Sequence, residues 1–370
     1  MNIAFYIDEM NLRGVANSTY QYAYYNKKIL KNNSIIFYNK KNFRNNKKVI
    51  LKFKKTFNVL GVNYFKDIDN YKAKFNINFI YTQKSGEKDK WVSDKIKTLV
   101  HFVYPQKLSE IHGYRYVCVS NWLSNKFFNN KIPYLPYIVD IKKTKSDLKK
   151  KLKIKKKQIV FGCHGGESSF DLMFTHDALI DIVNRRKDII FIFLNINKFC
   201  THPQIIFIKG SLDEIYKRKF INTCDAMIYG RSLGESFGLS CGEFALLSKR
   251  IILYKFNRHR SHIQSLPQKM VYEYSTKKSL TNIIERFDKK KEIKYVKTEN
   301  KYLNCTPLKM MKKFKKVFLS KYKTPQINYS DKIKNFYSFI ELGYYYIRHK
   351  FYHHYYKYIE SRIYSKKSNL

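Results

Sequence analysis

Short apolar runs that alternate with helical segments occupy the first third of the chain. The runs rich in β-branched and aromatic residues are IAFYI (3–7), SIIFY (34–38), INFIY (77–81), LVHFV (99–103) and YVCVS (116–120). Helical patterns cover Val15 to Leu30 and NWLSNKFF (121–128). Continuous apolar strands separated by helices are typical of buried parallel sheets, so this part of the sequence predicts an α/β unit.

The same alternation starts again after residue 158. The predicted strands are IVFGCHGG (159–166), IIFIFLNI (189–196), IIFIKG (205–210), DAMIYG (225–230) and RIILYK (250–255). HDALIDIVNRR, EIYKRKFIN and LSCGEFALL supply the helices. The pattern therefore predicts two successive α/β units. The lysine-rich segment 142–158 between them is interpreted as a solvated connector or exposed helix, with contact to an anionic surface as the alternative.

The chain ends in a Tyr-, Lys- and His-rich segment that begins near Ser330. Its aromatic residues recur at helical spacing, which predicts an amphipathic helix with a basic opposite face. We interpret it as a helix packed on the domains, and contact with a membrane surface or an acceptor is the alternative. The expected domains are 1–145, 146–325 and a helical tail, 326–370.

Composition excludes a disordered chain but does not identify a partner. Of the 370 residues, 44% are hydrophobic and 17% aromatic, which is too much for a chain that cannot collapse. The net charge of +45 favours nucleic acid, anionic membrane or phosphorylated ligands. However, Lys, Asn, Ile, Tyr and Phe, all abundant here, are encoded by A/T-rich codons. We therefore give the charge little weight.

The cysteines and the N-terminus bear on location. The six cysteines are scattered and form no C-x-x-C pair, which indicates a reduced protein rather than a disulfide framework or zinc site. Asp8 and Glu9 interrupt the stretch that a signal peptide would need to be apolar. No run reaches the roughly 18 apolar residues of a membrane span. The sequence predicts a cytoplasmic protein, either soluble or peripheral on the cytosolic face of a membrane.

The most specific motif is RSLGESFGLSCGEFALL (231–247), which follows a predicted strand and leads into a helix. This places it at the carboxyl edge of the second sheet, where ligands bind in open α/β folds. The amides of Phe237, Gly238 and Leu239 would form a helix N-terminus suited to phosphate or hydroxyl-rich ligands. Glu235 and Glu243 would flank the anion, one near sugar hydroxyls and the other near a ribose diol.

The stretch E-S-F-G-L-S-C-G-E resembles the E-x7-E signature of the family 4 retaining glycosyltransferases of GT-B fold. Further segments resemble that family in the same order along residues 1–255. They are RGVANSTYQYA (the glycine loop and first helix), YVCVSNWLSNKF, PYLPYIVD and IVFGCHGGESSFD (the first strand and glycine turn of the nucleotide-binding domain). The resemblance implies two Rossmann-like α/β domains that face each other across a cleft, followed by the helical tail.

The implied activity is transfer of a hexosyl unit from a UDP- or GDP-linked donor to a hydroxyl on a glycan, lipid or protein. The anomeric configuration would be retained, with no metal ion and no further cofactor. The implied catalytic residues are Glu235 and His101, although a core histidine is the other interpretation of His101. The implied donor-binding residues are Arg13, Gly14, Gly162, His164, Gly165, Gly166, Arg231, Ser236, Phe237, Gly238, Leu239 and Glu243.

The sequence departs from the family at the first strand of the second unit. The Arg and Lys that usually neutralise the donor diphosphate are absent from the stretch 162–167. His164, the amides of Gly165 and Gly166, and Arg231 could substitute. This departure keeps a second hypothesis open, a weak or inactive GT-B protein that binds nucleic acid or anionic membrane, although nucleic acid is not the expected partner. NRHRSH (257–262) is interpreted either as an acceptor or phosphate contact or as an exposed basic loop.

Overall fold

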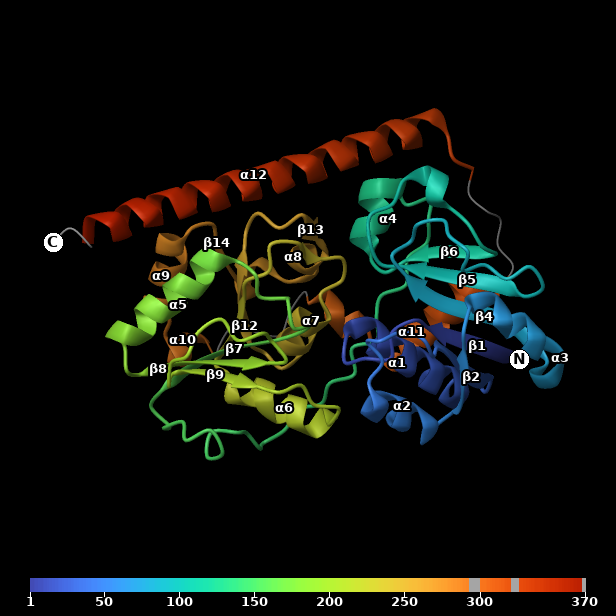
Figure 1. Cartoon of the computed structure of the whole chain (residues 1–370), viewed down its shortest axis with the longest axis horizontal. Helices are drawn as coiled ribbons and strands as arrows, with labels where there is room; N and C mark the ends of the chain where they lie inside the picture. The colour runs from blue at the N-terminus through green and yellow to red at the C-terminus, as the bar shows by residue number, and fades with distance from the viewer. Residues whose placement is uncertain (293–299, 321–325, 368–370) are drawn as a thin grey trace. The chain divides into compact units, whose positions relative to one another are not determined.

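The computed structural model describes residues 1–292, 300–320 and 326–367 (Figure 1). The chain forms two compact units. Unit 1 consists of Met1–Asp140 and Lys301–Ser338, and unit 2 of Ile141–Asn300 and Phe339–Leu370. Each unit holds one six-stranded sheet in which every strand pair is parallel.

The sheet of unit 1 has the strand order β3-β2-β1-β4-β5-β6. Its strands are β1 (Asn2–Ile7), β2 (Asn33–Asn39), β3 (Asn58–Val62), β4 (Ile77–Lys84), β5 (Lys97–Phe102) and β6 (Arg115–Cys118). Its α-helices are α1 (Gly14–Lys28), α2 (Lys47–Lys54), α3 (Lys72–Phe75), α4 (Asn121–Phe128) and α11 (Pro307–Phe314). Local sequence sets the helix ends: the Ser120 hydroxyl accepts from the Leu123 amide at the start of α4, and Asn129, in the left-handed conformation, follows its last residue.

Helix α11 belongs to unit 1, although it follows the whole sheet of unit 2 in sequence. Thr306 caps the helix and Pro307 occupies its first turn. Phe314 is fully buried, with its ring centroid 5.5 Å from those of both Tyr22 and Tyr81. This packing differs from the domain bounds predicted from sequence, which placed 301–325 with the second sheet.

The sheet of unit 2 has the order β14-β12-β10-β7-β8-β9. Its strands are β7 (Ile159–His164), β8 (Ile189–Leu194), β9 (Ile205–Ile208), β10 (Ala226–Tyr229), β12 (Arg250–Tyr254) and β14 (Val271–Tyr274). A two-stranded parallel sheet joins β11 (Gly234–Glu235) and β13 (His259–Arg260). The helices are α5 (Met173–Arg185), α6 (Glu214–Thr223), α7 (Leu239–Leu246), α8 (Ser261–Ser265), α9 (Lys277–Glu285), α10 (Lys289–Glu292) and most of α12 (Tyr329–Lys367).

The strand order creates one switch point in each sheet. In unit 1 the chain builds β1, β2 and β3 in one direction and then returns to place β4 on the other side of β1. In unit 2 it builds β7, β8 and β9 and then returns to place β10 beside β7. Loops after the two central strands diverge at such a point and leave a crevice at the carboxyl edge, where open α/β sheets bind ligands.

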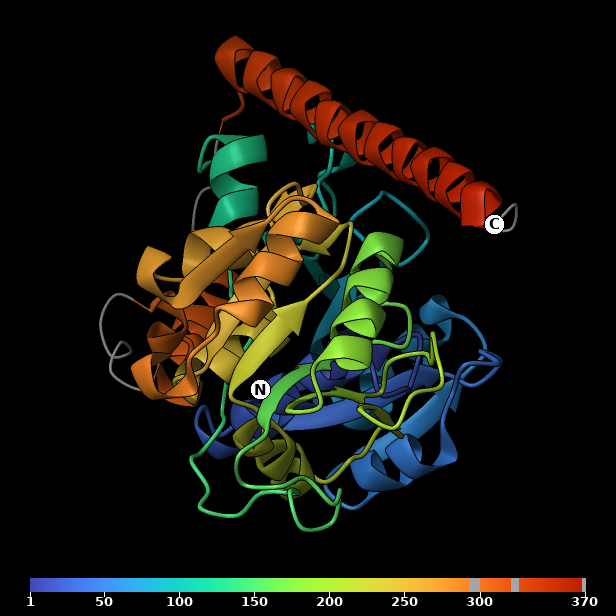
Figure 2. The ribbon, with the colours of Figure 1, turned by 90° about the vertical axis from the view of Figure 1, so that its left-hand side faces the viewer.

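The fold class predicted from sequence is confirmed: the chain contains two Rossmann-like α/β units and a long C-terminal helix (Figures 1 and 2). Segment 142–158 forms neither helix nor strand, and two apolar side chains, Leu148 and Ile154, anchor it. This agrees with the interpretation as a connector. Among the described residues, no helix has the length and apolar character of a membrane span.

Candidate active site

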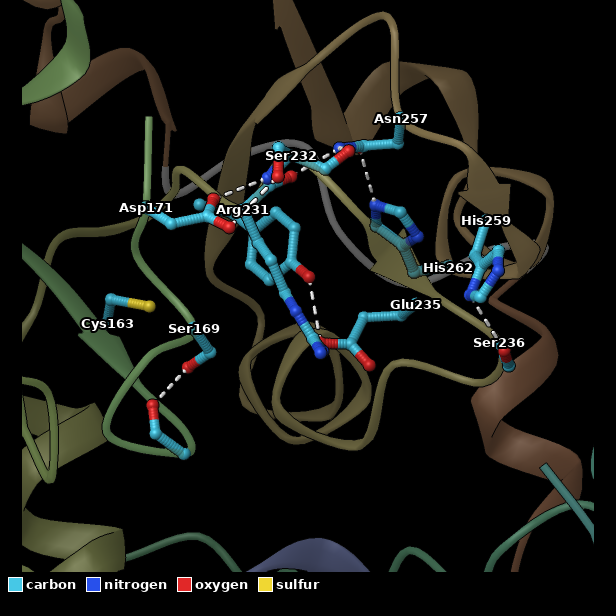
Figure 3. Close-up of polar contacts among 12 residues, drawn as sticks. Cys163, Ser169, Asp171, Arg231, Ser232, Glu235, Ser236, Asn257, His259 and His262 are labelled. Carbon is cyan, nitrogen blue, oxygen red and sulfur yellow. Dashed lines mark hydrogen bonds and ion pairs between the residues drawn. The ribbon is translucent and has the colours of Figure 1, made fainter. Parts of the chain in front are cut away.

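The predicted motif residues gather at the switch point of unit 2. The glycine turn follows β7, and the segment that contains Arg231 and Glu235 follows the neighbouring strand, β10 (Figure 3). The two predicted segments therefore meet at one edge of the sheet, although about 65 residues separate them in sequence.

Two nearby residues in sequence and the close approach of the neighbouring strand β13 hold Glu235 in place. Its Oε1 accepts hydrogen bonds of 2.8 Å from the Tyr229 hydroxyl and from the Arg231 guanidinium. Gly234 has φ of +73°, and a Cβ there would lie 2.1 Å from the backbone oxygen of His259. Only glycine fits this close approach, which sets the position of Glu235 relative to β13.

The segment NRHRSH forms a buried frame behind Glu235 rather than an exposed loop. Asn257 and His262 are fully buried, and His262 Nε2 lies 3.2 Å from the Asn257 side-chain oxygen. The Asn257 amide donates to the backbone oxygens of Arg231 and Ser232. Burial lowers the pKa of His262 to about 4, so its ring is neutral near neutral pH. The frame ties the loop that carries Arg231 to β13 (Figure 3).

Two further contacts fix the ends of this loop. The Asp171 carboxylate accepts from the amide and the hydroxyl of Ser232, at 2.7 and 2.9 Å. The Ser236 hydroxyl lies 3.1 Å from His259 Nδ1 (Figure 3). Burial lowers the pKa of His259 to about 3, which leaves this ring neutral as well. Ser236 was predicted to contact the donor, and in the structure it is a buried link to β13.

Helix α7 begins directly after the Glu235 loop. Gly238 takes the N-cap position with φ of +85°, a left-handed conformation that favours glycine. Leu239 is the first helical residue, and the first intrahelical bond runs from Gly242 N–H to Gly238 C=O at 2.9 Å. The preceding amides of the first turn point away from the helix body, as at any helix N-terminus, and favour an anion. The Phe237 side chain is buried.

Glu243 lies inside unit 2 and forms a buried ion-pair cluster. Its Oε1 accepts from Lys217 Nζ at 2.6 Å, and its Oε2 lies 3.0 Å from His164 Nε2. Lys217 comes from α6 and also pairs with Glu214 at 2.9 Å. The cluster joins the end of β7, α6 and α7 at the same edge of the sheet.

The charges of this cluster stabilise one another. Burial alone would raise the pKa of Glu243, but the Lys217 charge and contact with His164 outweigh it and lower the pKa to about 2. Burial likewise opposes the charge on Lys217, and the two carboxylates still raise its pKa. Glu243 and Lys217 are therefore both ionised near neutral pH.

The glycines within β7 and directly after it have different roles. At Gly162 a Cβ would lie 2.3 Å from Cys224 Sγ, so this glycine is required by packing inside the sheet. At Gly165 a Cβ would lie 2.4 Å from Ser169 Oγ, whereas at Gly166 nothing lies within 4 Å. Gly166 is thus open to a ligand. Cys163 is buried, and burial raises the pKa of its thiol, as expected for a residue that fills space.

The structure does not support a catalytic role for His101. Its side chain is fully buried in unit 1, where Nδ1 lies 2.6 Å from the Tyr81 hydroxyl and Nε2 2.9 Å from the Leu135 carbonyl oxygen. Burial lowers the pKa of this histidine to about 3. The alternative interpretation, a core histidine with both ring nitrogens engaged, describes this placement.

Arg13 and Gly14 lie at the other switch point. Both are exposed at the start of α1, after β1 of unit 1. No atom lies within 4 Å of a Cβ built on Gly14, which leaves its backbone open. Their position at a carboxyl edge is the one that ligand binding requires.

Sequence reasoning missed Lys217, the buried cation of this site. The pairing of Lys217 with Glu243 depends on how α6 and α7 pack, and no local pattern encodes it. One signal could have found it: Lys217 lies in the first turn of a predicted helix that follows a strand of the same sheet, close to where a ligand would bind. Among the described residues, no group of three or more His, Cys, Asp or Glu side chains is arranged to hold a metal ion.

Comparison with known proteins identifies the fold. No protein-family model matches the sequence, and no curated protein matches it. Among solved structures, a glycosyltransferase from Rickettsia africae superposes with a TM-score of 0.64 at 16% identity, over 86% of this chain and 99% of that chain. HepE from Anabaena in complex with UDP-glucose gives a TM-score of 0.65 at 11% identity, over 87% and 100% of the two chains.

A Listeria monocytogenes protein assigned as a UDP-N-acetylglucosamine 2-epimerase is also similar, with a TM-score of 0.54 at 8% identity over 88% of this chain and 99% of that chain. At these identities the likeness shows the fold alone. The chain has the GT-B fold, with two Rossmann-like units built on parallel six-stranded sheets. Activity has to be argued from the site.

Proposed function

We propose that the protein is a glycosyltransferase that moves a sugar from a nucleotide-sugar donor to a hydroxyl acceptor. One observation carries the proposal: the switch point of unit 2 brings Glu235, the first turn of α7 and the Lys217–Glu243 pair to one edge of the sheet. A donor needs a site for its sugar hydroxyls and a site for its diphosphate. A carboxylate beside a helix N-terminus supplies both kinds of contact.

Glu235 is the proposed contact to the donor sugar. Tyr229 and Arg231 hold its Oε1, so the carboxylate is oriented before a ligand arrives. The amides of Phe237, Gly238 and Leu239 would take the phosphates, with those of Gly165 and Gly166 from the glycine turn. Departure of the nucleoside diphosphate creates negative charge, and fixed donors and cations lower the barrier by stabilising it.

Glu243 is proposed to hold the ribose, as the family resemblance implies. Both of its oxygens are engaged, so this contact requires His164 or Lys217 to yield one of them. Lys217 would supply a cation near the diphosphate, which the stretch 162–167 lacks. The proposed transfer retains the anomeric configuration and needs no metal ion. A phosphate oxygen of the donor accepts the proton of the acceptor hydroxyl.

UDP- and GDP-linked sugars are the donors to test. The UDP-glucose bound to HepE supports a uridine donor for a similar fold. For the acceptor we propose a hydroxyl group on a glycan, lipid or protein, and for the location the cytosolic side of an anionic membrane. Epimerisation of the donor is the competing activity suggested by the Listeria neighbour, and it would leave the donor intact except at one carbon.

The test is calorimetric titration of the full chain with UDP, GDP and their sugar conjugates. The account predicts that one nucleotide binds and that Glu243→Gln weakens it at least about tenfold, because one charged hydrogen bond is lost. Glu273→Gln, on β14 of the same unit, is the control and should bind as the wild type. The proposal is refuted if no nucleotide binds to a protein that melts cooperatively. Equal nucleotide affinity in wild type, Glu243→Gln and Glu273→Gln would show that Glu243 does not contact the nucleotide.

A further inference from the structure

Helix α12 packs on unit 2 through one set of aromatic side chains. The ring of Phe174 on α5 lies 5.2 Å from that of Tyr352 and 6.0 Å from that of Tyr356, centroid to centroid. The Tyr356 hydroxyl also donates to the Asp177 carboxylate at 2.8 Å. Leu342 is buried in the same row. These side chains follow one another at helical spacing and form the inner face of the helix.

A second row of large side chains runs along the opposite face and is exposed. Its members follow each other by three or four residues, which places them on one stripe. They are Ile340, Tyr344, Ile347, Phe351, Tyr355 and Tyr358, with exposed fractions from 51% for Tyr358 to 76% for Phe351. At 100° per residue, the centres of the two rows lie about 140° apart around the helix axis, so the stripe faces away from α5.

In Figures 1 and 2, no other described element of unit 2 is drawn on the side of α12 that faces away from α5, which agrees with the exposed fractions of the stripe. A contiguous row of exposed apolar side chains is unusual on a protein surface and marks an interaction site. The finding also revises the expectation from sequence, since the face opposite the packed row is apolar as well as basic.

The chemistry of the stripe indicates its partner. Tyrosine and phenylalanine predominate, and Tyr is enriched where proteins meet the membrane–water interface. Arg348, Lys350 and His354 are exposed beside the stripe. Over residues 329–367 the sequence carries eight Lys or Arg and three Asp or Glu, a net charge of +5. A basic helix with an aromatic face lies in the plane of an anionic bilayer surface rather than across it.

We propose that the outer face of α12 binds the surface of an anionic lipid bilayer through this stripe. The inference rests on the membrane contact included in the proposed function and is independent of the transfer reaction. It specifies which surface makes that contact.

A second copy of the chain fits the stripe less well. Each copy carries a net charge of +45, and pairing two α12 helices would place two +5 surfaces within the Debye length, about 8 Å at physiological salt. Helix pairs that associate through such a stripe use interdigitating Leu, Ile and Val, whereas four of the six side chains here are Tyr or Phe. Anionic lipid, in contrast, is attracted by the same charge.

Vesicle flotation of the full chain tests the inference. The vesicles are phosphatidylcholine alone and phosphatidylcholine mixed with phosphatidylglycerol. Wild type should float with the anionic vesicles and not with the neutral ones. The triple variant Tyr344→Ser, Ile347→Ser, Phe351→Ser should bind at least about tenfold more weakly, because interfacial apolar contacts are lost. The matched control carries Phe43→Ser, Leu51→Ser and Tyr64→Ser, three exposed side chains of unit 1, and should bind as the wild type.

A second measurement reports the stripe directly without removing it. In Phe351→Trp the tryptophan emission should shift to shorter wavelength when anionic vesicles are added, and in Phe43→Trp it should not. Equal flotation of the triple variant and wild type, or no shift in Phe351→Trp, would overturn the inference in favour of a diffuse electrostatic contact. A wild-type dimer that becomes monomeric in the triple variant would assign the stripe to a second copy.

These outcomes are separable from those of the proposed function. Failure to bind any nucleotide would leave vesicle flotation unaffected, and loss of flotation would leave the nucleotide titration unaffected.

Discussion

The Lys217–Glu243 pair allows a quantitative prediction, because both charges are buried and their partners are known. The pKa of Glu243 falls from an ordinary value of 4.5 to about 2. A carboxyl group that binds its proton less tightly when folded stabilises the folded state above its unfolded pKa. Here the difference corresponds to about 3 kcal/mol near neutral pH. This stabilisation is lost as pH falls from about 4.5 towards 2.

We expect Lys217→Met to lower the free energy of unfolding of unit 2 by roughly 3–5 kcal/mol near neutral pH, because Glu243 is then left buried without its main counter-charge. Methionine keeps the length of the lysine stem, so the cavity term is small. The difference from wild type should shrink as pH falls through the range in which Glu243 becomes protonated. Urea unfolding followed by circular dichroism at a series of pH values measures it.

Lys219→Met, two residues along the same helix, is the control, because no ion pair involves Lys219 among the described residues. It should change stability by less than about 0.5 kcal/mol at any pH. A difference between Lys217→Met and wild type that stays constant with pH would refute the argument that charge on Glu243 is responsible. A Lys217→Met protein as stable as Lys219→Met would show that the buried pair is not formed.

Two further predictions concern residues whose roles the structure separates. Gly234→Ala should destabilise unit 2 by roughly 2–4 kcal/mol in melting experiments, because a Cβ would lie 2.1 Å from the His259 backbone oxygen at a left-handed φ. Gly166→Ala should leave the melting of unit 2 unchanged, because nothing lies within 4 Å of a Cβ built there. His101→Phe should lower stability by about 1–3 kcal/mol through loss of two buried hydrogen bonds, while turnover per folded molecule is unchanged. A large loss of turnover in the folded His101 variant would restore its catalytic assignment.

The sequence predicted most of the sheets because their central strands are continuous apolar runs. In the two six-stranded sheets, the strands that it did not predict are β3 and β14, which lie at sheet edges; the short strands β11 and β13 were not predicted either. Gly61 interrupts the apolar run of β3, and β14 carries Glu273 in a four-residue segment. An edge strand has a neighbouring strand on one side only and is less covered, so it needs fewer apolar residues. Its apolar pattern in the sequence is therefore weak. Helix α11 could not be placed from sequence, since its partners Tyr22 and Tyr81 are more than 200 residues away.

The candidate site was predicted in part. The E-x7-E spacing located Glu235 and Glu243 because the motif is local and its strand and helix are recognisable. It did not reveal that Glu243 is buried against Lys217, because that contact depends on the packing of two helices. Nothing in the sequence separates a core histidine from a catalytic one, and the burial of His101 and its two ring contacts are visible only in the structure. The alternating pattern of 257–262 concealed a buried frame, since its charged residues suggested a surface loop.

The proposed transfer reaction is tested most directly by release of nucleotide from a panel of UDP- and GDP-linked sugars. The full chain is incubated with each donor, with and without added hydroxyl acceptors, beside Glu235→Gln and the control Glu273→Gln. The account predicts that wild type and control release the same nucleotide from one class of donor, and that Glu235→Gln still binds it but turns over at least about 100-fold more slowly, a loss typical of one transition-state contact. Equal turnover by Glu235→Gln and wild type, or epimerised donor with no nucleotide released, would contradict it.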